Sequence, residues 1–288
     1  MRLETALKLG RVSNLPTVLT NAMAGMALAG AGIVPASLAL VTLGAGLAYV
    51  AGMFLNDAFD APYDAVNQPY RPIPAGLASR GEVFAWGYGL LGAAVVLIVV
   101  AGTLAGTALA AGLVGLVLAG VIIAYNRNHK ENAFGPVLMG LCRVMVYVAA
   151  ALALTTAPGQ ALWLGALVLM AHVMGLTFIA KQEGAGLVGR LWPLVALAVA
   201  PLYGLYLAMA QPVLLLLVAA LLAADIVAVR YTRARPKPQF GRAIPLLIAA
   251  IPLLDAMLIA SQGHLALALL ACLGFPLTLI LQRWVRGT

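Results

Sequence analysis

Three of the nine acidic residues of this chain stand within eight positions of one another. They are Asp57, Asp60 and Asp64, and Asn56 directly precedes the first of them. Spacings of three and four residues place side chains on one face of an α-helix. Carboxylates on one face repel each other, and no lysine or arginine lies between Met53 and Gln68 to compensate them. The cluster therefore predicts a partner that the local sequence does not supply.

A divalent cation is the partner that these residues favour. Carboxylate and amide oxygens without nearby His or Cys suit Mg²⁺, which proteins commonly hold through one or two carboxylates together with substrate phosphates. Asp57, Asp60 and Asp64 are the predicted metal ligands, and a solvated acidic surface is the alternative. Pro62 leaves a second point open, because a proline can end a helix and would then place Asp64 in the following loop.

The segment after the acidic cluster has the composition of a rigid loop. Residues 67–76 contain three prolines within six positions, which predicts a stiff, non-helical conformation. Arg71 is the one charged residue in this segment. A guanidinium held in a fixed place is well matched to phosphate oxygens, so Arg71 is a candidate phosphate ligand. A basic residue that merely marks a membrane surface is the alternative interpretation.

The elements that must position these residues are long apolar segments. Of the 288 residues 64% are hydrophobic and 9% are charged, against roughly 25% charged in soluble domains. The apolar runs are long enough to cross roughly 30 Å of hydrocarbon as helices. Ten runs stand out, at about 14–32, 37–57, 82–102, 105–125, 135–154, 161–180, 191–209, 212–229, 242–260 and 264–284. The prediction is an all-α polytopic transmembrane helical bundle of nine or ten helices that forms a single domain, residues 1–288.

The basic residues are distributed regularly between these runs. All except Arg143 lie before the first run or after the second, fourth, sixth, eighth and tenth, which places them on one side of a membrane. Cytoplasmic loops collect Lys and Arg. Both termini and the loop with the acidic cluster are therefore expected on the cytoplasmic side of a prokaryotic inner membrane. The net charge of +8 follows from this topology, and basic residues are not interleaved with aromatic ones as single-strand binding requires, so no nucleic acid partner is expected.

The motifs after the second run resemble the UbiA superfamily of intramembrane prenyltransferases. The family signature NDxxDxxxD is matched by residues 56–64, and the following RPxPxG is matched by residues 71–76. A basic, tyrosine-containing loop, Tyr125–Lys130, leads into the glycine-containing segment Gly135–Arg143 and looks like a diverged form of the next family motif. Within the superfamily the pattern looks more like the Ebo-type members than the quinone enzymes.

A third family motif departs from the pattern. After the sixth helix the family usually carries a second aspartate motif, often DxEGD. Here the chain reads Lys181, Gln182, Glu183, Gly184 and Ala185, so only the Glu-Gly pair is kept. The resemblance then implies one carboxylate, Glu183, where the family has three. It also suggests that Lys181 partly replaces a second metal as a point charge near the diphosphate.

The resemblance implies Mg²⁺-dependent transfer of a prenyl group from an isoprenoid diphosphate to a small acceptor within the lipid bilayer. The three aspartates would hold the cation, and Lys181 and Glu183 would complete the catalytic set. The implied substrate-binding residues are Asn56, Arg71, Arg127, Lys130 and Arg143. The altered third motif keeps an alternative open, a non-catalytic isoprenoid-diphosphate binding or transport protein. The sequence predicts neither the acceptor nor the length of the prenyl chain.

Arg143, Asp255 and His172 are among the polar residues that lie inside the predicted spans. Charges in spans are rare and usually face a partner or a cavity. Arg143 in the fifth run is predicted to reach the diphosphate or to form an internal ion pair. Asp255 in the ninth run is expected to pair or to line a cavity. His172 in the sixth run is expected to be an interior histidine with satisfied hydrogen bonds and not a catalyst.

Overall fold

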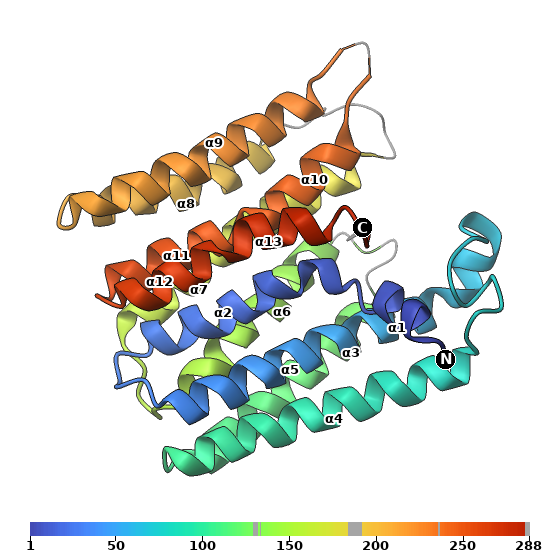
Figure 1. Cartoon of the computed structure of the whole chain (residues 1–288), viewed down its shortest axis with the longest axis horizontal. Helices are drawn as coiled ribbons and strands as arrows, with labels where there is room; N and C mark the ends of the chain where they lie inside the picture. The colour runs from blue at the N-terminus through green and yellow to red at the C-terminus, as the bar shows by residue number, and fades with distance from the viewer. Residues whose placement is uncertain (129–131, 133, 184–191, 236, 286–288) are drawn as a thin grey trace.

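The computed structural model describes residues 1–128, 132, 134–183, 192–235 and 237–285, and the regular structure in these residues is helical (Figure 1). The α-helices are α1 (Leu3–Leu9), α2 (Leu15–Leu28), α3 (Pro35–Asn67), α4 (Arg80–Leu104), α5 (Ala108–Asn128), α6 (Gly135–Leu152), α7 (Gln160–Lys181), α8 (Trp192–Ala208), α9 (Leu215–Thr232), α10 (Phe240–Ala249), α11 (Ile251–Ser261), α12 (Leu265–Cys272) and α13 (Gly274–Leu281). Two short 3₁₀ helices, η1 (Val12–Asn14) and η3 (Pro212–Leu214), precede α2 and α9.

The apolar runs of the sequence become helices that suit a bilayer. Within the described residues, seven helical stretches are long and apolar enough to cross a membrane. They are Pro35–Asn67, Arg80–Leu104, Ala108–Asn128, Gly135–Leu152, Gln160–Lys181, Pro212–Thr232 and Phe240–Ser261. Trp192–Ala208 and Leu265–Leu281 are shorter apolar stretches. The all-α, multi-pass membrane architecture is thus confirmed.

The count of nine or ten helices is not confirmed. A short helix, α1, precedes the first apolar run, and the ninth and tenth runs are each divided into two helices, at Ala250 and at Leu273. Each division lies next to a proline, Pro252 in α11 and Pro276 in α13. Proline has no N–H to bond the carbonyl four residues earlier, so it interrupts the regular hydrogen-bond ladder.

Helix α3 is longer than its apolar run and continues through Pro62 to Asn67. The alternative in which Asp64 projects from a loop is therefore wrong. Pro62 cannot donate to the carbonyl of Ala58, four residues earlier. That carbonyl instead accepts a hydrogen bond of 2.8 Å from Nε of Arg80. Because the orphaned acceptor is satisfied from outside, the helix carries all three aspartates beyond the apolar run.

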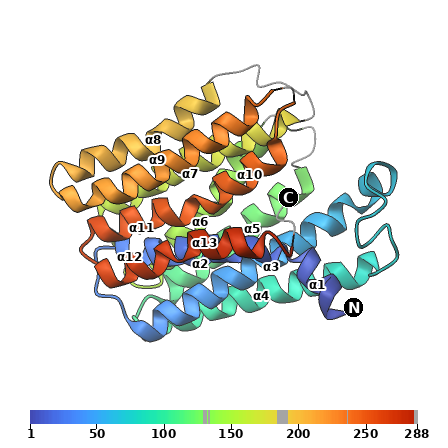
Figure 2. The same cartoon turned by 45° about the horizontal axis from the view of Figure 1, so that its top comes forward.

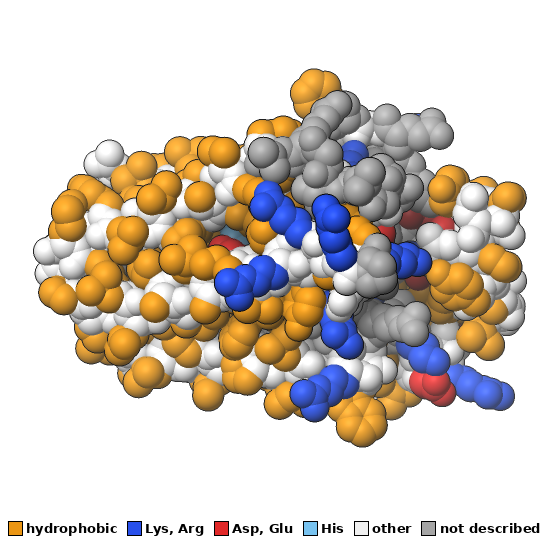
Figure 3. Space-filling view, turned by 90° about the horizontal axis from the view of Figure 1, so that it is seen from above, with side chains coloured by type: hydrophobic (Ala, Val, Ile, Leu, Met, Phe, Trp, Pro, Cys, Tyr) orange, Lys and Arg blue, Asp and Glu red, His pale blue; other side chains and the backbone are white. Residues whose placement is uncertain are grey.

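The helices lie side by side, and the polar connections gather at one end of the bundle. Both termini lie at the same end as the segment between α3 and α4, whereas the connections from α2 to α3 and from α8 to α9 lie at the opposite end (Figures 1 and 2). On the face that Figure 3 shows, Lys and Arg side chains gather over one part, and many hydrophobic side chains cover the end away from them. This arrangement agrees with the one-sided placement expected from the charges. That this side is cytoplasmic remains a prediction.

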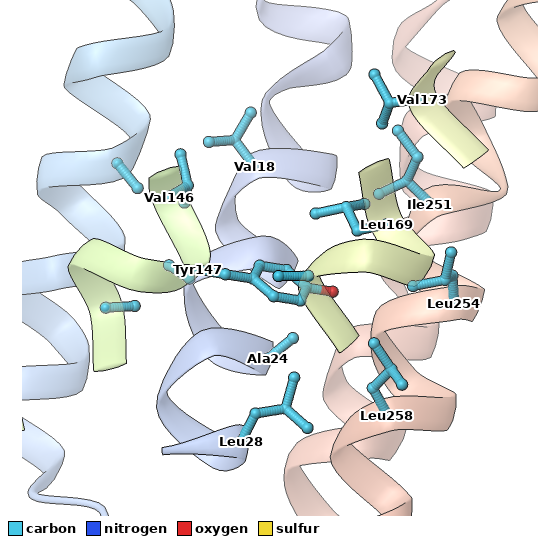
Figure 4. Packing of buried hydrophobic residues seen from close by; sticks show 14 of the residues in the cluster. Val18, Ala24, Leu28, Val146, Tyr147, Leu169, Val173, Ile251, Leu254 and Leu258 are labelled. Atoms are coloured by element: carbon cyan, nitrogen blue, oxygen red, sulfur yellow. The ribbon is translucent and has the colours of Figure 1, made fainter. Parts of the chain in front are cut away.

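Helix α2 packs into the centre of the bundle through a glycine. A Cβ atom added to Gly25 would lie 2.5 Å from the carbonyl oxygen of Tyr147 in α6, closer than any side chain allows. Tyr147 is fully buried, and its ring lies among Val18, Leu28 and Leu169 with the hydroxyl pointing toward α11 (Figure 4). Small residues permit such close approach in membranes, where packing drives helix association.

Substitution of Gly25 by leucine should separate α2 from α6. We expect a loss of about 1–3 kcal/mol in stability, because the backbone of α6 has to move to relieve the overlap. Thermal unfolding of the purified protein in detergent measures the effect. Gly120→Leu is the matched control, since Gly120 is also helical but an added Cβ there meets nothing within 4 Å. Equal unfolding temperatures for the two variants would contradict the close contact.

Candidate active site

The three aspartates lie at the polar end of α3 and are almost completely buried. Asp57, Asp60 and Asp64 are 5%, 8% and 1% exposed. Oδ1 of Asp57 accepts hydrogen bonds of 3.0 Å from both Arg11 and Arg71. Nε of Arg71 also lies 3.7 Å from Oδ2 of Asp64. The repulsion within the cluster is therefore compensated by arginines from two other segments, and burial makes that compensation stronger than it would be in water.

Arg11 was missed as a site residue, because its position before the first apolar run was explained by topology alone. Its side chain also donates to Oδ1 of Asn56 at 3.2 Å, and its carbonyl accepts from the hydroxyl of Tyr49 at 3.2 Å. Its backbone has φ 42° and ψ 48°, the left-handed region. That conformation costs a non-glycine residue on the order of 1–3 kcal/mol and persists only where the surroundings fix it. The turn between α1 and η1 is thus held in the shape that aims Arg11 at α3.

Asn56 ties the cluster to α5. Its Nδ2 donates to Oδ1 of Asn126 at 3.2 Å, and Nδ2 of Asn126 donates to the carbonyl of Gly52 at 3.0 Å. Gly52 lies one turn before Asn56 on α3. The pair of amides therefore fixes the end of α5 against α3. Asn126 was not predicted as a site residue. The only sequence signal for it was its place in the segment that resembles the second family motif.

A cavity of about 320 Å³ lies beside the cluster, within the roughly 300–1,000 Å³ of ligand pockets. Its walls come from α2, α3, α5, α6, α7, α10 and α11, and most of its lining is apolar. Arg11 and Asn126 line one part, so the cavity adjoins the aspartate cluster through them. Tyr49, Cys142 and Arg143 are further lining residues. The arrangement joins an apolar chamber to a polar, charged rim.

Arg143 lines the chamber and is fixed from α2. Its guanidinium donates to Oδ1 of Asn21 at 2.9 Å and to Oγ1 of Thr17 at 3.0 Å, and it lies 5.8 Å from the centre of the Tyr49 ring. Asn21 in turn donates to Asp255 at 2.8 Å. Arg143 and Asp255 therefore do not contact each other directly, and Asn21 bridges them. Within the described residues Arg143 forms hydrogen bonds to neutral side chains and not the predicted internal ion pair, so one wall of the chamber carries a fixed cation.

Asp255 is fully buried in α11 and is held by donors from two other helices. Its carboxylate accepts hydrogen bonds from Thr20 and Asn21 in α2 and from the hydroxyl of Tyr147 in α6. This agrees with the expectation that Asp255 pairs. The expectation for His172 is met only in part: Nε2 lies 3.2 Å from the carbonyl of Leu247, whereas Nδ1 has no hydrogen-bond partner within the described residues.

The other predicted site residues are exposed or lie outside the described residues. Arg127 is exposed in the last turn of α5. Lys181 is exposed at the end of α7, and its Nζ donates to the carbonyl of Asn132 at 2.7 Å. Glu183 is exposed directly after α7. Lys130 and most of the divergent third motif, from Gly184 onward, lie outside the described residues.

The fit of the cluster to Mg²⁺ was tested on its donor set. In the part of the chain that the structure describes, no three His, Cys, Asp or Glu side chains lie close enough together to hold a metal ion. Mg²⁺ is commonly bound through one or two carboxylates, with substrate phosphates and water as the remaining ligands. Buried carboxylates on one helix face suit that mode, and they do not suit a closed, all-protein metal cage.

These features define a class: a multi-pass membrane bundle with an apolar chamber and a buried carboxylate–arginine cluster at its polar rim. Residues 18–240 match the UbiA prenyltransferase family, and the chain belongs to that family. The resemblance inferred from the aspartate motif is thereby confirmed. The Ebo-type branch stays a prediction.

Curated relatives match only part of the chain. A digeranylgeranylglyceryl phosphate synthase of Metallosphaera sedula is 34% identical over 98 residues, which cover 34% of this chain and 32% of the relative. The matched segments span between 13% and 32% of the lengths of the curated relatives.

Solved structures match the whole fold. A UbiA homolog from Archaeoglobus fulgidus bound to GPP and Mg²⁺ has a TM-score of 0.62 at 14% identity, covering 91% of this chain and 99% of that one. A UbiA homolog from Aeropyrum pernix K1 has a TM-score of 0.55 at 17% identity, covering 94% and 98%. At these identities the likeness shows the fold alone.

Replacement of Asp255 by leucine should destabilise the bundle, because Thr20, Asn21 and Tyr147 would lose a shared acceptor in an apolar interior. We expect a loss of about 1–3 kcal/mol, seen as a lower unfolding temperature in detergent. Ser261→Ala is the control in the same helix, since its hydroxyl bonds only the carbonyl of Leu258 and its neighbour Gln262. A loss no larger than that of the control would show that the network does not hold α11.

Proposed function

We propose that this protein transfers a prenyl group from an isoprenoid diphosphate to a small acceptor, with Mg²⁺ at the aspartates of α3. The observation that supports this proposal most directly is that Arg11 takes part in both the chamber and the aspartate cluster. It lines the apolar chamber, and it also binds Asp57 at 3.0 Å. A substrate with an anionic head and an apolar tail can place the head at this arginine while the tail lies in the chamber.

Arg11 and Arg71 are placed to bind the diphosphate end of the substrate. Arg11 and Arg71 hold their guanidinium groups on Asp57, and guanidinium binds phosphate oxygens as readily as carboxylates. The arginines can therefore exchange carboxylate for diphosphate without leaving the rim. Positive charge placed in advance where the leaving diphosphate gains negative charge is commonly the largest contribution to such a reaction.

Mg²⁺, when bound, supplies Lewis-acid stabilisation of the leaving diphosphate. Asp57, Asp60 and Asp64 supply the carboxylates, one or two of which would hold it together with the substrate phosphates, and Asn56 can offer an amide oxygen. Support comes from the donor chemistry of the cluster and from the Archaeoglobus fulgidus homolog, which was solved with GPP and Mg²⁺. The side of the membrane that carries this cluster is proposed to be cytoplasmic, in line with the basic residues at the same end.

The chamber serves the reacting carbon and the isoprenoid tail. Its lining is mostly apolar, so water is kept from a carbon that develops positive charge as the diphosphate departs. Arg143, fixed by Thr17 and Asn21, is the charged group of the α6 wall and is proposed to bind an oxygen-bearing part of a substrate. A glyceryl phosphate is the first acceptor class to test, because the curated relatives are named digeranylgeranylglyceryl phosphate synthases.

A non-catalytic diphosphate-binding protein is the second candidate. The observation that favours it is the loss of the family's second aspartate motif, where Glu183 is exposed and Lys181 bonds a backbone carbonyl.

The two functions differ in the release of pyrophosphate. Purified protein supplied with Mg²⁺, a set of prenyl diphosphates and a cell lipid extract should release pyrophosphate and form prenylated products detectable by mass spectrometry. Binding of the diphosphates without release would support the second candidate.

Asp57→Asn should reduce Mg²⁺-dependent pyrophosphate release by about a hundredfold, because an amide does not neutralise the cation. The fold should persist, since the amide oxygen still accepts from Arg11 and Arg71. The assay compares release rates at saturating Mg²⁺, together with unfolding temperatures. Glu4→Gln is the control, because Glu4 is exposed and pairs with Lys8. Wild-type rates in Asp57→Asn would show that Asp57 only holds Arg11 and Arg71 against α3 and takes no part in the reaction.

Lys181→Ala tests whether the divergent third motif takes part. If Lys181 stabilises the departing diphosphate, kcat should fall by about a hundredfold, roughly 3 kcal/mol, while KM changes little. Lys237→Ala removes a charge from another connection and should leave both constants unchanged. An unaltered kcat in Lys181→Ala would show that the lysine only marks the side of the membrane.

A further inference from the structure

Asp225 is a buried acidic residue that the proposed reaction does not use. It lies in the membrane-spanning helix α9 and is only 6% exposed. Neither of its carboxylate oxygens has a hydrogen-bond partner within the described residues. Asp255, the other acidic residue deep in a span, accepts bonds from three side chains. A buried carboxylate without donors is unfavourable in hydrocarbon, and such residues usually mark a site.

The nearest ionisable neighbour does not satisfy this carboxylate. His172 in α7 lies within electrostatic range of Asp225, but no hydrogen bond or ion pair joins them. Its Nε2 faces the carbonyl of Leu247 at 3.2 Å and therefore carries the hydrogen, which leaves Nδ1 as an acceptor in the neutral ring. The Asp225 carboxylate therefore lacks a hydrogen-bond donor within the described residues, and His172 does not supply one.

Asp225 lines a groove of about 430 Å³ between α8 and α9. Its walls are apolar and include Leu197, Pro201 and Leu222. Pro201 lies inside α8 and has no N–H for the carbonyl of Leu197, so this carbonyl lacks its usual intrahelical donor. The groove therefore combines apolar sides with acceptor oxygens at its interior.

The polar end of the same groove is positively charged. Arg230 and Arg233 line it, and they follow Asp225 on α9 by five and eight residues, about 7.5 and 12 Å along the axis. Both arginines line the same groove as Asp225, nearer to the C-terminal end of α9. Neither forms an ion pair with it.

The order of these groups specifies a ligand. From the polar end inward the groove offers two cations, then acceptors, then apolar wall. A lipid phosphate with a free hydroxyl between its phosphate and its chain presents the matching order: anion, donor, hydrocarbon. A diacyl phosphate lipid lacks the donor, and an uncharged monoacyl lipid lacks the anion. Basic pockets between transmembrane helices are known binding places for lipid head groups.

We propose that the groove between α8 and α9 binds a single-chain glycerophosphate lipid of the bilayer, with the phosphate on Arg230 and Arg233 and the glycerol hydroxyl on Asp225. The lipid chain then lies along Leu197, Pro201 and Leu222. This site is separate from the chamber beside Asp57, because no residue lines both cavities.

The test uses the full-length protein in detergent and native mass spectrometry with three probes that differ by one group each. Oleoyl lysophosphatidic acid has phosphate and hydroxyl, dioleoyl phosphatidic acid has no free hydroxyl, and monooleoylglycerol has no phosphate. The wild type should bind the first at least tenfold more tightly than either of the others. Equal affinity for the two phosphates would overturn the proposal.

Variants separate the two contacts. Asp225→Leu should fold, because it removes a carboxylate without partners, and it should bind both phosphate lipids alike. Arg233→Ala should weaken both phosphate lipids about equally and keep the preference for the free hydroxyl. Arg235→Ala is the control, because Arg235 is an arginine beyond the end of α9 that does not line the groove. Retention of the hydroxyl preference in Asp225→Leu would show that the carboxylate serves only His172, and would refute the assignment.

Discussion

The carboxylate of Asp57 is shared by two guanidinium groups that reach it from different directions along the chain. Arg11 comes from the turn between α1 and η1, and Arg71 comes from the proline-rich segment after α3. The cluster stands at the C-terminal end of a long helix, where the helix dipole adds further negative charge. Three buried aspartates could not remain there together without this compensation. The left-handed turn at Arg11 and the stiff loop at Arg71 therefore have the same effect: each brings an arginine to the buried, negatively charged aspartates.

The same end of α3 determines how the neighbouring elements begin and end. Pro62 has no N–H to donate to the carbonyl of Ala58, and Arg80 at the start of α4 donates to this carbonyl instead. Asn126 at the end of α5 is bonded to Asn56 and to the carbonyl of Gly52. The turn after α1, the start of α4 and the end of α5 are each bonded to this helix end by polar contacts, so the charged groups of the rim are positioned without a substrate. Rigid placement of charge is what electrostatic stabilisation of a leaving group requires.

The sequence predicted the helical runs and the side on which they are joined, because both follow from hydropathy and charge along a local window. It left the end of α3 open, since the continuation through Pro62 depends on Arg80, 22 positions away from the carbonyl it bonds. The division of the last two runs was also missed. Proline positions were visible there, but a hydropathy window averages over them.

The aspartate cluster was predicted from spacing, and its partners were not. Arg11 lies 46 positions from Asp57, and the amide of Asn126 lies 70 positions from that of Asn56. No local pattern links residues so far apart. Arg11 also had a sufficient explanation as a basic residue at a membrane surface, so nothing in the sequence demanded a second role for it. The expectation that a divalent cation relieves the repulsion in the cluster did not include the arginines that folding brings to it.

Asp225 and Asp255 also show that partners distant in the sequence cannot be predicted from a local pattern. Both are single aspartates in apolar helices, and a sequence window makes them equivalent. In the structure Asp255 receives donors from α2 and α6, and one of them, Thr20, is 235 positions away. Asp225 receives none from the described residues. The difference lies in what packs against each helix: the central α2 carries Thr20 and Asn21 toward α11, whereas the walls of the groove beside α9 are apolar side chains. Asp255 therefore holds helices of the chain to each other. Asp225 instead lines a groove between α8 and α9, and its carboxylate accepts no hydrogen bond from the described residues.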